Sequence, residues 1–173
     1  MGAKLNSIDI VSSAMRAVNQ TLVAMLNITL DELPAMRREE YSGSVVLASE
    51  GTYISFVALT QSVDNQNIKG GICVYISKSN VSVLFNSLGI TDMSLDTEIR
   101  DICGEFCNIV TGGFKTEIVR MGYNDVQLTL PQNSADDISE WLGGMTETQK
   151  YRISFAYKGR GLLVTDIYMG IAA

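Results

Sequence analysis

A helical repeat of apolar residues is the first strong pattern along the chain. Apolar side chains recur at alternating steps of three and four, at Ile8, Val11, Met15, Val18, Leu22 and Met25. This period predicts an amphipathic helix with one buried face. We expect the helix to end near Asn27, because Pro34 further along the chain cannot continue it.

The middle of the chain changes to the composition of β-strands. Segments 54–63 and 68–77 are rich in β-branched and aromatic residues, and turn-forming residues separate them. Together they predict an antiparallel hairpin. A further short strand is predicted at 45–49, and the charged segment 37–44 before it is predicted to be a loop.

Two more helices are predicted after this hairpin. The first is short, lies within residues 81–90 and is stopped by Gly89. Its expected inward side chains are Val81, Leu84, Phe85 and Leu88. The second is long, is capped by Asp92 or Ser94, and ends near Gly122. Its predicted core face consists of Ile99, Ile102, Phe106, Ile109 and Gly113.

The C-terminal third returns to strand patterns. Residues 125–131 alternate between polar and apolar and predict a strand. Residues 132–149 are predicted to be a polar connection in which Trp141 is exposed. Segments 151–157 and 161–171 flank a short turn sequence rich in glycine and therefore predict a second hairpin.

Length and composition fit one folded domain over residues 1–173. Of these residues, 46% are hydrophobic and 18% are charged, which is enough to bury a core without disulfides. Helices mixed with antiparallel hairpins indicate an α+β fold. In this fold the β-sheet hairpins pack with the long helix, the N-terminal helix and the short helix.

Charge and cysteine usage exclude several classes of partner. Thirteen basic residues against nineteen acidic ones give a net charge of −6. Without a basic stripe, neither nucleic acid nor an anionic membrane surface is expected as a partner. The sequence has no apolar run of eighteen residues and no signal-peptide pattern. Its three cysteines form no disulfide framework, so a cytoplasmic location is expected.

The absence of histidine narrows the candidate chemistry further. It removes Ser-His-Asp and Cys-His catalysis, as well as most zinc and iron sites. Cys103 and Cys107 lie four residues apart on one helix but offer only two ligands. We therefore expect small buried side chains there, and no metal. The glycine pairs at 70–71, 112–113 and 143–144 lack the pattern of a phosphate-binding loop.

One line of polar residues on the long helix is the remaining candidate site. At about 100° per residue, the line holds Asp101, Glu105, Asn108 and Lys115, with Gly104 and Gly112 beside them. A solvated helix side explains such a line, and so does a surface that presents a carboxylate and an amide to a partner. Asparagine is a poor residue within a helix, and the glycines indicate close packing or a bare, approachable surface.

The spacing of this line resembles the motif of the CheC/CheX/FliY chemotaxis phosphatases. That motif reads D/S-x-x-x-E-x-x-N, and a proline follows the asparagine after twenty-two residues. Asp101, Glu105, Asn108 and Pro131 stand at the four matching positions. The predicted order of elements is similar to this family over nearly the whole chain. A single motif per chain is similar to CheX-type members.

The resemblance implies a phosphatase that removes the aspartyl phosphate of a phosphorylated CheY-like response regulator. By the same resemblance, Asn108 orients the attacking water and Glu105 pairs with the active-site lysine of the receiver. The receiver supplies Mg²⁺, so no cofactor of the chain's own is implied. We expect Asp101 to extend the polar contact with the receiver one turn earlier on the helix. We expect Pro131 to shape the loop that follows its predicted strand. A homodimer is implied as well.

Two other functions stay open at this point. A non-catalytic receiver-binding scaffold, or a flagellar-switch-type module, would use the same helix surface for contact alone. A small-molecule enzyme would instead use Asp101 and Glu105 as an acid and a base. The convex surface of a helix is a poor pocket for such an enzyme.

Overall fold

An antiparallel sheet forms the centre of the molecule. The computed structural model describes residues 7–31, 34–41, 51–63, 66–86, 89 and 95–172. Its strands are β1 (Ala35–Glu39), β2 (Thr52–Val63), β3 (Gln66–Ser77), β4 (Gln127–Leu128), β5 (Met145–Tyr157) and β6 (Arg160–Ala172). Within the described residues they form one sheet in the order β1-β5-β6-β3-β2-β4, in which every neighbouring pair is antiparallel.

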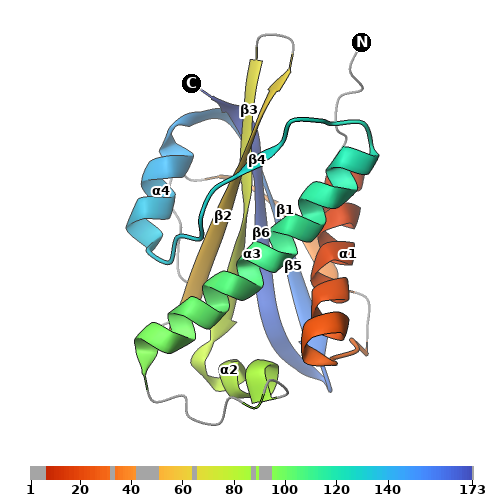
Figure 1. Cartoon of the computed structure of the whole chain (residues 1–173), viewed down its shortest axis with the longest axis vertical. Helices are drawn as coiled ribbons and strands as arrows, with labels where there is room; N and C mark the ends of the chain where they lie inside the picture. Colours follow the sequence, from red (N-terminus) through yellow and green to blue (C-terminus); the bar gives the residue numbers. More distant parts are fainter. Residues whose placement is uncertain are drawn as a thin grey trace.

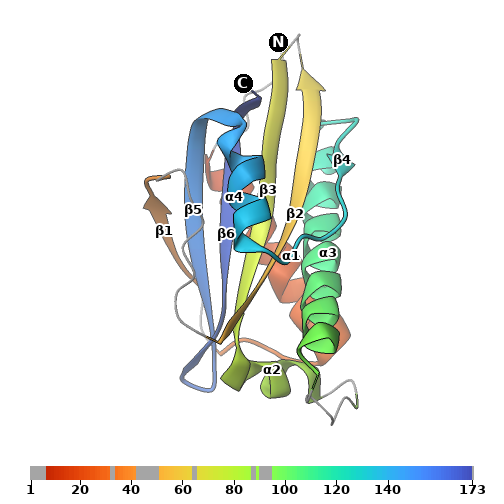
Figure 2. The same cartoon turned by 90° about the vertical axis from the view of Figure 1, so that its left-hand side faces the viewer.

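Helices cover both faces of this sheet. α1 (Ser7–Leu26) and α3 (Asp96–Arg120) lie on one face, and α2 (Lys78–Phe85) lies at one end of the sheet (Figure 1). α4 (Ala135–Gly143) lies on the opposite face (Figure 2). The larger apolar cluster of the described core lies between the sheet and the helices α1 and α3, and a smaller one lies under α4. The predicted α+β class is therefore confirmed.

Both predicted hairpins are confirmed. β2 pairs with β3 over its whole length, from Thr52 opposite Ser77 to Val63 opposite Gln66. β5 pairs with β6 as the C-terminal pattern predicts. β6 also pairs with β3, which joins the two local hairpins into a single sheet.

α1 and α3 pack closely against each other. A Cβ atom on Gly113 would lie 3.4 Å from the Cβ of Ala17, so a small residue is needed at this crossing. Arg16 on α1 forms a salt bridge of 3.2 Å with Glu117 on α3. Gly122, just after α3, has a φ of 97°, a conformation that glycine adopts without strain. The long helix therefore ends where the sequence predicts.

The prediction of a charged loop at 37–44 is wrong for the first part of that segment. Ala35–Glu39 form β1 and pair with β5. Four of these five residues are exposed, so no alternation of buried and exposed positions marks the strand. Pairing with a strand more than a hundred residues away creates β1, and a local pattern does not reveal such pairing.

The chain after α3 also differs from the prediction. Of the predicted strand 125–131, only Gln127–Leu128 pair as strand. The predicted connection 132–149 contains α4 and the start of β5. The side chain of Ser134 caps α4, accepting a hydrogen bond from the Asp137 backbone N–H at 3.5 Å. A helix of nine residues is too short for its apolar repeat to stand out.

Three apolar side chains lie differently from expectation. Ile8, the first position of the apolar repeat in α1, was predicted on the buried face but is 75% exposed. Ile109 was predicted in the core but is 39% exposed, because Phe106 and Val110 take the buried positions of that turn. Trp141 was predicted to be exposed but is half-buried, with its ring centroid 5.4 Å from that of Phe56. The ring of Trp141 thus belongs to the smaller apolar cluster under α4.

Two expectations fall outside the described residues, namely the strand at 45–49 and the inward direction of Leu88. The prediction that Asp92 or Ser94 caps the long helix is wrong, because the N-cap of α3 is Leu95, whose side chain makes no capping hydrogen bond. Among the helices that the structure describes, none combines the length and the apolar character needed to span a membrane.

Candidate functional site

α3 carries the predicted polar line on its outer side. The side chains of Asp101 and Glu105 are exposed, and that of Asn108 is half-buried. On the opposite side of the helix, Cys107 and Val110 are fully buried against the sheet. Within the described part of the chain, no side-chain hydrogen bond or ion pair occupies the three polar residues. Both the carboxylates and the amide are therefore available to a partner.

Gly104 brings the distant Pro131 against this line. A Cβ atom on Gly104 would lie 3.4 Å from the Cβ of Pro131 and 3.5 Å from the Oδ1 of Asn133. The segment that contains the motif proline therefore packs on the helix one residue before Glu105. This contact explains why the proline belongs to the same spacing pattern as the helix residues, although it follows Asn108 by more than twenty residues.

The segment around Pro131 is held firmly to β2. The backbones of Phe56 and Gln132 exchange two hydrogen bonds of 2.8 Å each. The hydroxyl of Ser55 donates a hydrogen bond of 2.7 Å to the Oδ1 of Asn133. These bonds fix the segment on the sheet. Its contact with Gly104 therefore fixes how far α3 lies from the sheet at the polar line.

Other contacts anchor α3 to the sheet, one before the polar line and one within its length. The Tyr53 hydroxyl on β2 donates a hydrogen bond of 2.7 Å to Asp96 in the first turn of α3. Burial, and to a smaller extent this hydrogen bond, raises the pKa of Tyr53 to about 12. One turn after Gly104, the Cys107 thiol donates to the Ser55 carbonyl at 3.4 Å. The polar line is thus displayed on a helix with little freedom to shift.

The glycines of α3 differ in what they contact. Gly104 and Gly113 pack closely, as the sequence suggested. Gly112 does not: a Cβ atom there would have no described neighbour within 4 Å. Close packing inside the chain is therefore the wrong explanation for Gly112. Its position leaves α3 bare one turn after Asn108, where an outside partner can approach the helix backbone.

The three cysteines are buried and free. Burial raises the pKa of Cys73 well above its ordinary value and raises the pKa values of Cys103 and Cys107 to about 12. The prediction that these two helix cysteines are small buried side chains is confirmed. Among the described residues, no group of three or more acidic, cysteine or histidine side chains is placed to hold a metal ion.

Thiol labelling measures this burial directly. We expect the three thiols of the native protein to react with a disulfide reagent at pH 8 at least about a hundredfold more slowly than those of the unfolded chain. Slow access and a low thiolate fraction both contribute. The same sample in denaturant supplies the control, and it should release three equivalents of thiol. Fast labelling of Cys103 in the native state would contradict the buried helix face.

Two residues beside the line escaped the sequence analysis. Asn133 and Ser55 form the hydrogen bond that fixes the Pro131 segment, yet they lie 78 residues apart in the chain. Asn133 stands in the residues just before the Ser134 cap, which is a weak local signal for a structural role. Ser55 lies within an apolar strand pattern that hides it.

The arrangement suits contact with another macromolecule. Glu105 offers an exposed acceptor for a cation, and Asn108 offers an amide that both donates and accepts hydrogen bonds. The outer side of α3 is convex, and convex surfaces rarely bind small substrates. The acid and base pair of Asp101 and Glu105 is for this reason the least favoured chemistry.

Comparisons with known proteins give a family and a set of similar structures. The family model described as chemotaxis phosphatase CheX matches residues 53–138, a range that includes Glu105, Asn108 and Pro131. A CheC-like superfamily protein from Shewanella sp. PV-4 has a similar structure with a TM-score of 0.68. It is 19% identical over 95% of this chain and 99% of that chain.

Two further solved structures share the fold. CheX from Vibrio vulnificus has a TM-score of 0.66 and is 17% identical over 93% of this chain and 99% of that chain. A CheX–CheY–BeF3–Mg²⁺ complex from Borrelia burgdorferi gives a TM-score of 0.61 and 17% identity, over 96% of this chain and 99% of that chain. No curated protein sequence matches the chain.

Proposed function

The chain belongs to the CheC/CheX/FliY family, and from this premise we propose that it dephosphorylates the aspartyl phosphate of a CheY-like response regulator. One observation carries the proposal for this chain: Pro131 packs on Gly104 beside the exposed Glu105 and the half-buried Asn108. The spacing in the sequence thus corresponds to one compact surface on α3.

Asn108 is the proposed catalytic residue. Its carboxamide would hold a water molecule in line with the phosphorus atom of the receiver's aspartyl phosphate. The water oxygen bonds to phosphorus, the bond from phosphorus to the aspartate oxygen breaks, and the products are inorganic phosphate and a free carboxylate. Alignment of a nucleophile in this way contributes several kcal/mol to barrier lowering, on the order of 5 kcal/mol.

Glu105 is the proposed anchor. Its exposed carboxylate has no partner among the described residues and is free to pair with the receiver's active-site lysine. A charge-assisted hydrogen bond at a desolvated interface fixes the register of the two proteins. Asp101 lies one turn earlier on the same side, so it extends the acidic contact.

Supporting roles fall to the glycines, the proline and the receiver. Gly112 keeps the surface of α3 bare one turn after Asn108. The contact between Gly104 and Pro131 positions the turn of α3 that carries Glu105. We assign Mg²⁺ to the receiver and no cofactor to this chain. The Borrelia burgdorferi complex, which contains CheY and Mg²⁺, supports that division.

We also propose how the chain is organised. Residues 1–173 form a single domain, because the described helices all pack on one sheet. We propose a homodimer because the chain resembles CheX-type members, and a cytoplasmic location because its three cysteines form no disulfide framework.

A phosphate-release assay tests the function. A panel of CheY-type receivers is phosphorylated with acetyl phosphate, the donor is removed, and the loss of phosphorylated receiver is followed with and without this protein. We expect substoichiometric protein to accelerate the loss at least about tenfold for one receiver. Binding to that receiver without acceleration would support the scaffold or flagellar-switch module instead.

A further inference from the structure

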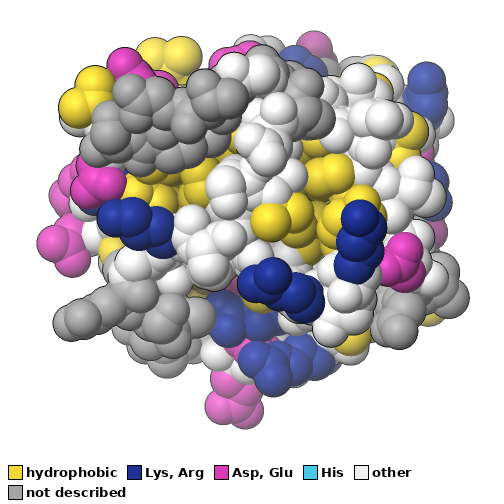
Figure 3. All heavy atoms as spheres, turned by 90° about the horizontal axis from the view of Figure 1, so that it is seen from below, with side chains coloured by type: hydrophobic (Ala, Val, Ile, Leu, Met, Phe, Trp, Pro, Cys, Tyr) yellow, Lys and Arg dark blue, Asp and Glu magenta, His cyan; other side chains and the backbone are white. Residues whose placement is uncertain are grey.

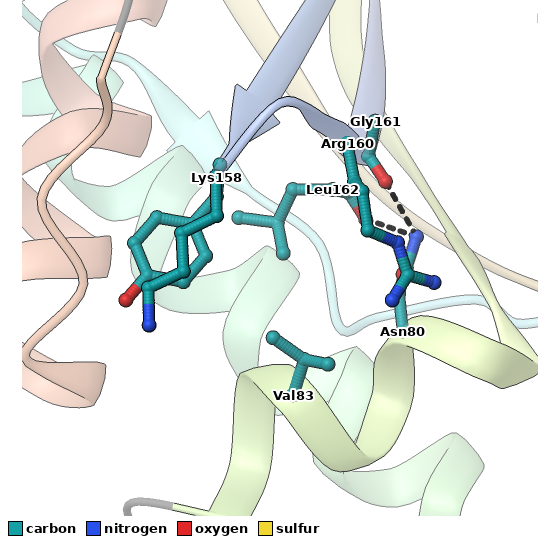
Figure 4. A pocket seen from close by; sticks show the side chains of 7 residues that line it. Asn80, Val83, Lys158, Arg160, Gly161 and Leu162 are labelled. Carbon is teal, nitrogen blue, oxygen red and sulfur yellow. Dashed lines mark hydrogen bonds between the residues drawn. The ribbon is translucent and has the colours of Figure 1, made fainter.

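A pocket lies at the end of the molecule that contains α2, and none of its lining residues belongs to the polar line of α3. Its volume is about 230 Å³, and it opens between α2 and the turn that joins β5 to β6 (Figure 4). Apolar side chains of Val83, Tyr157 and Leu162 line it, together with the cations Lys158 and Arg160. This size suits a ligand smaller than most drug-like molecules.

The hairpin turn sets the direction of the side chains on one side of the pocket. Lys158 and Gly159 both have positive φ, 49° and 71°, as the two central residues of a type I′ turn require. Tyr157 stands directly opposite Arg160 in the strand register. The register of β5 and β6 shifts between Phe155 and Ala156, which leaves Leu162 as the extra residue of a bulge in β6. Leu162 and Arg160 both line the pocket, so its apolar lining and the arginine come from the same short segment of β6.

α2 closes the other side. Asn80 and Val83 lie three residues apart, which places both on one face of the helix. The Asn80 amide donates hydrogen bonds of 2.8 Å and 3.0 Å to the carbonyls of Gly161 and Leu162. These bonds fasten α2 to β6, so the pocket is formed before any ligand arrives.

The charge at this pocket is opposite in sign to that of the protein. The chain carries a net charge of −6, yet Lys158 and Arg160 stand on either side of Leu162 and Val83 (Figure 4). Seen from this end, the surface has apolar areas bordered by Lys and Arg side chains (Figure 3). Nearby Asp31 accepts a hydrogen bond from the Lys158 backbone. No ion pair joins a described carboxylate to the side chain of either cation.

We propose that this pocket binds a small organic anion with an apolar body, such as an aromatic or branched aliphatic carboxylate. The forked guanidinium of Arg160 receives the carboxylate, since its geometry matches two oxygens at once. The apolar body lies on Val83 and Leu162. Lys158 adds a second positive charge at the rim, with its Nζ 5.2 Å from the centroid of the Tyr157 ring.

Titration of the full chain with 3-phenylpropionate tests the proposal. The probe is followed by amide chemical shifts in ¹⁵N-labelled protein. We expect saturable shifts confined to the Asn80–Phe85 region of α2 and to Tyr157–Leu162. Arg160→Gln should raise the Kd at least about tenfold, because a hydrogen bond to a charged group is lost. The neutral analogue 3-phenylpropanol should bind at least about tenfold more weakly than the acid.

Lys78→Gln is the matched control. It removes the same charge from the first turn of α2, but Lys78 does not line the pocket. Its Kd should stay within about twofold of the parent value, because a charge beyond the contact distance is screened by salt. Absent saturable shifts in these two segments, equal affinity for the alcohol, or equal losses in the two variants would each overturn the proposal. The spectrum of each variant outside these segments reports whether it is folded.

Discussion

Replacing Asn108 with alanine is expected to slow the stimulated dephosphorylation of the receiver by at least about a hundredfold. The alanine removes the only proposed group that aligns the attacking water. Affinity for a receiver activated with beryllium fluoride should change by less than about threefold, because Glu105 carries the proposed anchoring contact. The rate is measured by loss of phosphorylated receiver, and the Kd by fluorescence anisotropy of a labelled receiver.

The variant is well suited to this test. Asn108 makes no side-chain hydrogen bond within the described chain, and alanine is the better helix former. Loss of fold is therefore not expected. Asn19→Ala is the matched control, since Asn19 is an exposed asparagine on α1 and belongs to no motif. It should leave the rate unchanged.

Glu105→Lys completes the comparison. A lysine there would face the receiver's lysine, so it should weaken the complex through like-charge repulsion. The two substitutions are thus expected to differ in effect. Asn108→Ala should lower the rate within the complex, and Glu105→Lys should weaken formation of the complex. If Asn108→Ala still accelerates phosphate loss as the parent does, Asn108 does not position the water.

Arg152→Met is expected to lower the free energy of unfolding by about 3 kcal/mol. Arg152 donates two hydrogen bonds of 2.7 Å to the carboxylate of Asp166, which is 0% exposed. This bidentate bond, against the effect of burial, raises the pKa of Arg152. Removing the guanidinium leaves a buried carboxylate with Lys150 as its remaining cation, 3.4 Å away. Incomplete compensation of a buried charge is the source of the loss.

Urea unfolding followed by the fluorescence of Trp141, the single tryptophan, measures this effect. Arg120→Met is the matched control, because it removes an exposed arginine that pairs with Glu117 at the surface of α3. Its change should stay within about 0.5 kcal/mol. Adding Asp166→Leu to Arg152→Met should recover part of the loss, since it removes the uncompensated carboxylate. Equal stabilities of the two single variants would contradict a stabilising role for the buried pair.

The sequence by itself determined the elements that depend on neighbouring residues. The apolar repeat of α1, the two hairpins and the long helix α3 were all predicted correctly, because each has a period of its own. The spacing from Asp101 to Pro131 was enough to identify the family. Short elements such as β1 and α4 were missed, since five and nine residues hold too little of a period to be recognised.

Tertiary structure decided what depends on residues far apart in the chain. The packing of Pro131 on Gly104, the bond between Ser55 and Asn133, and the pocket between α2 and the β5–β6 turn all require the order of strands in the sheet. That order comes from burying apolar faces on both sides of the sheet, a requirement of the whole chain and of no single segment. The common line of Asp101, Glu105 and Asn108 on α3 was readable in the sequence, but the contact that brings Pro131 beside it depended on the fold.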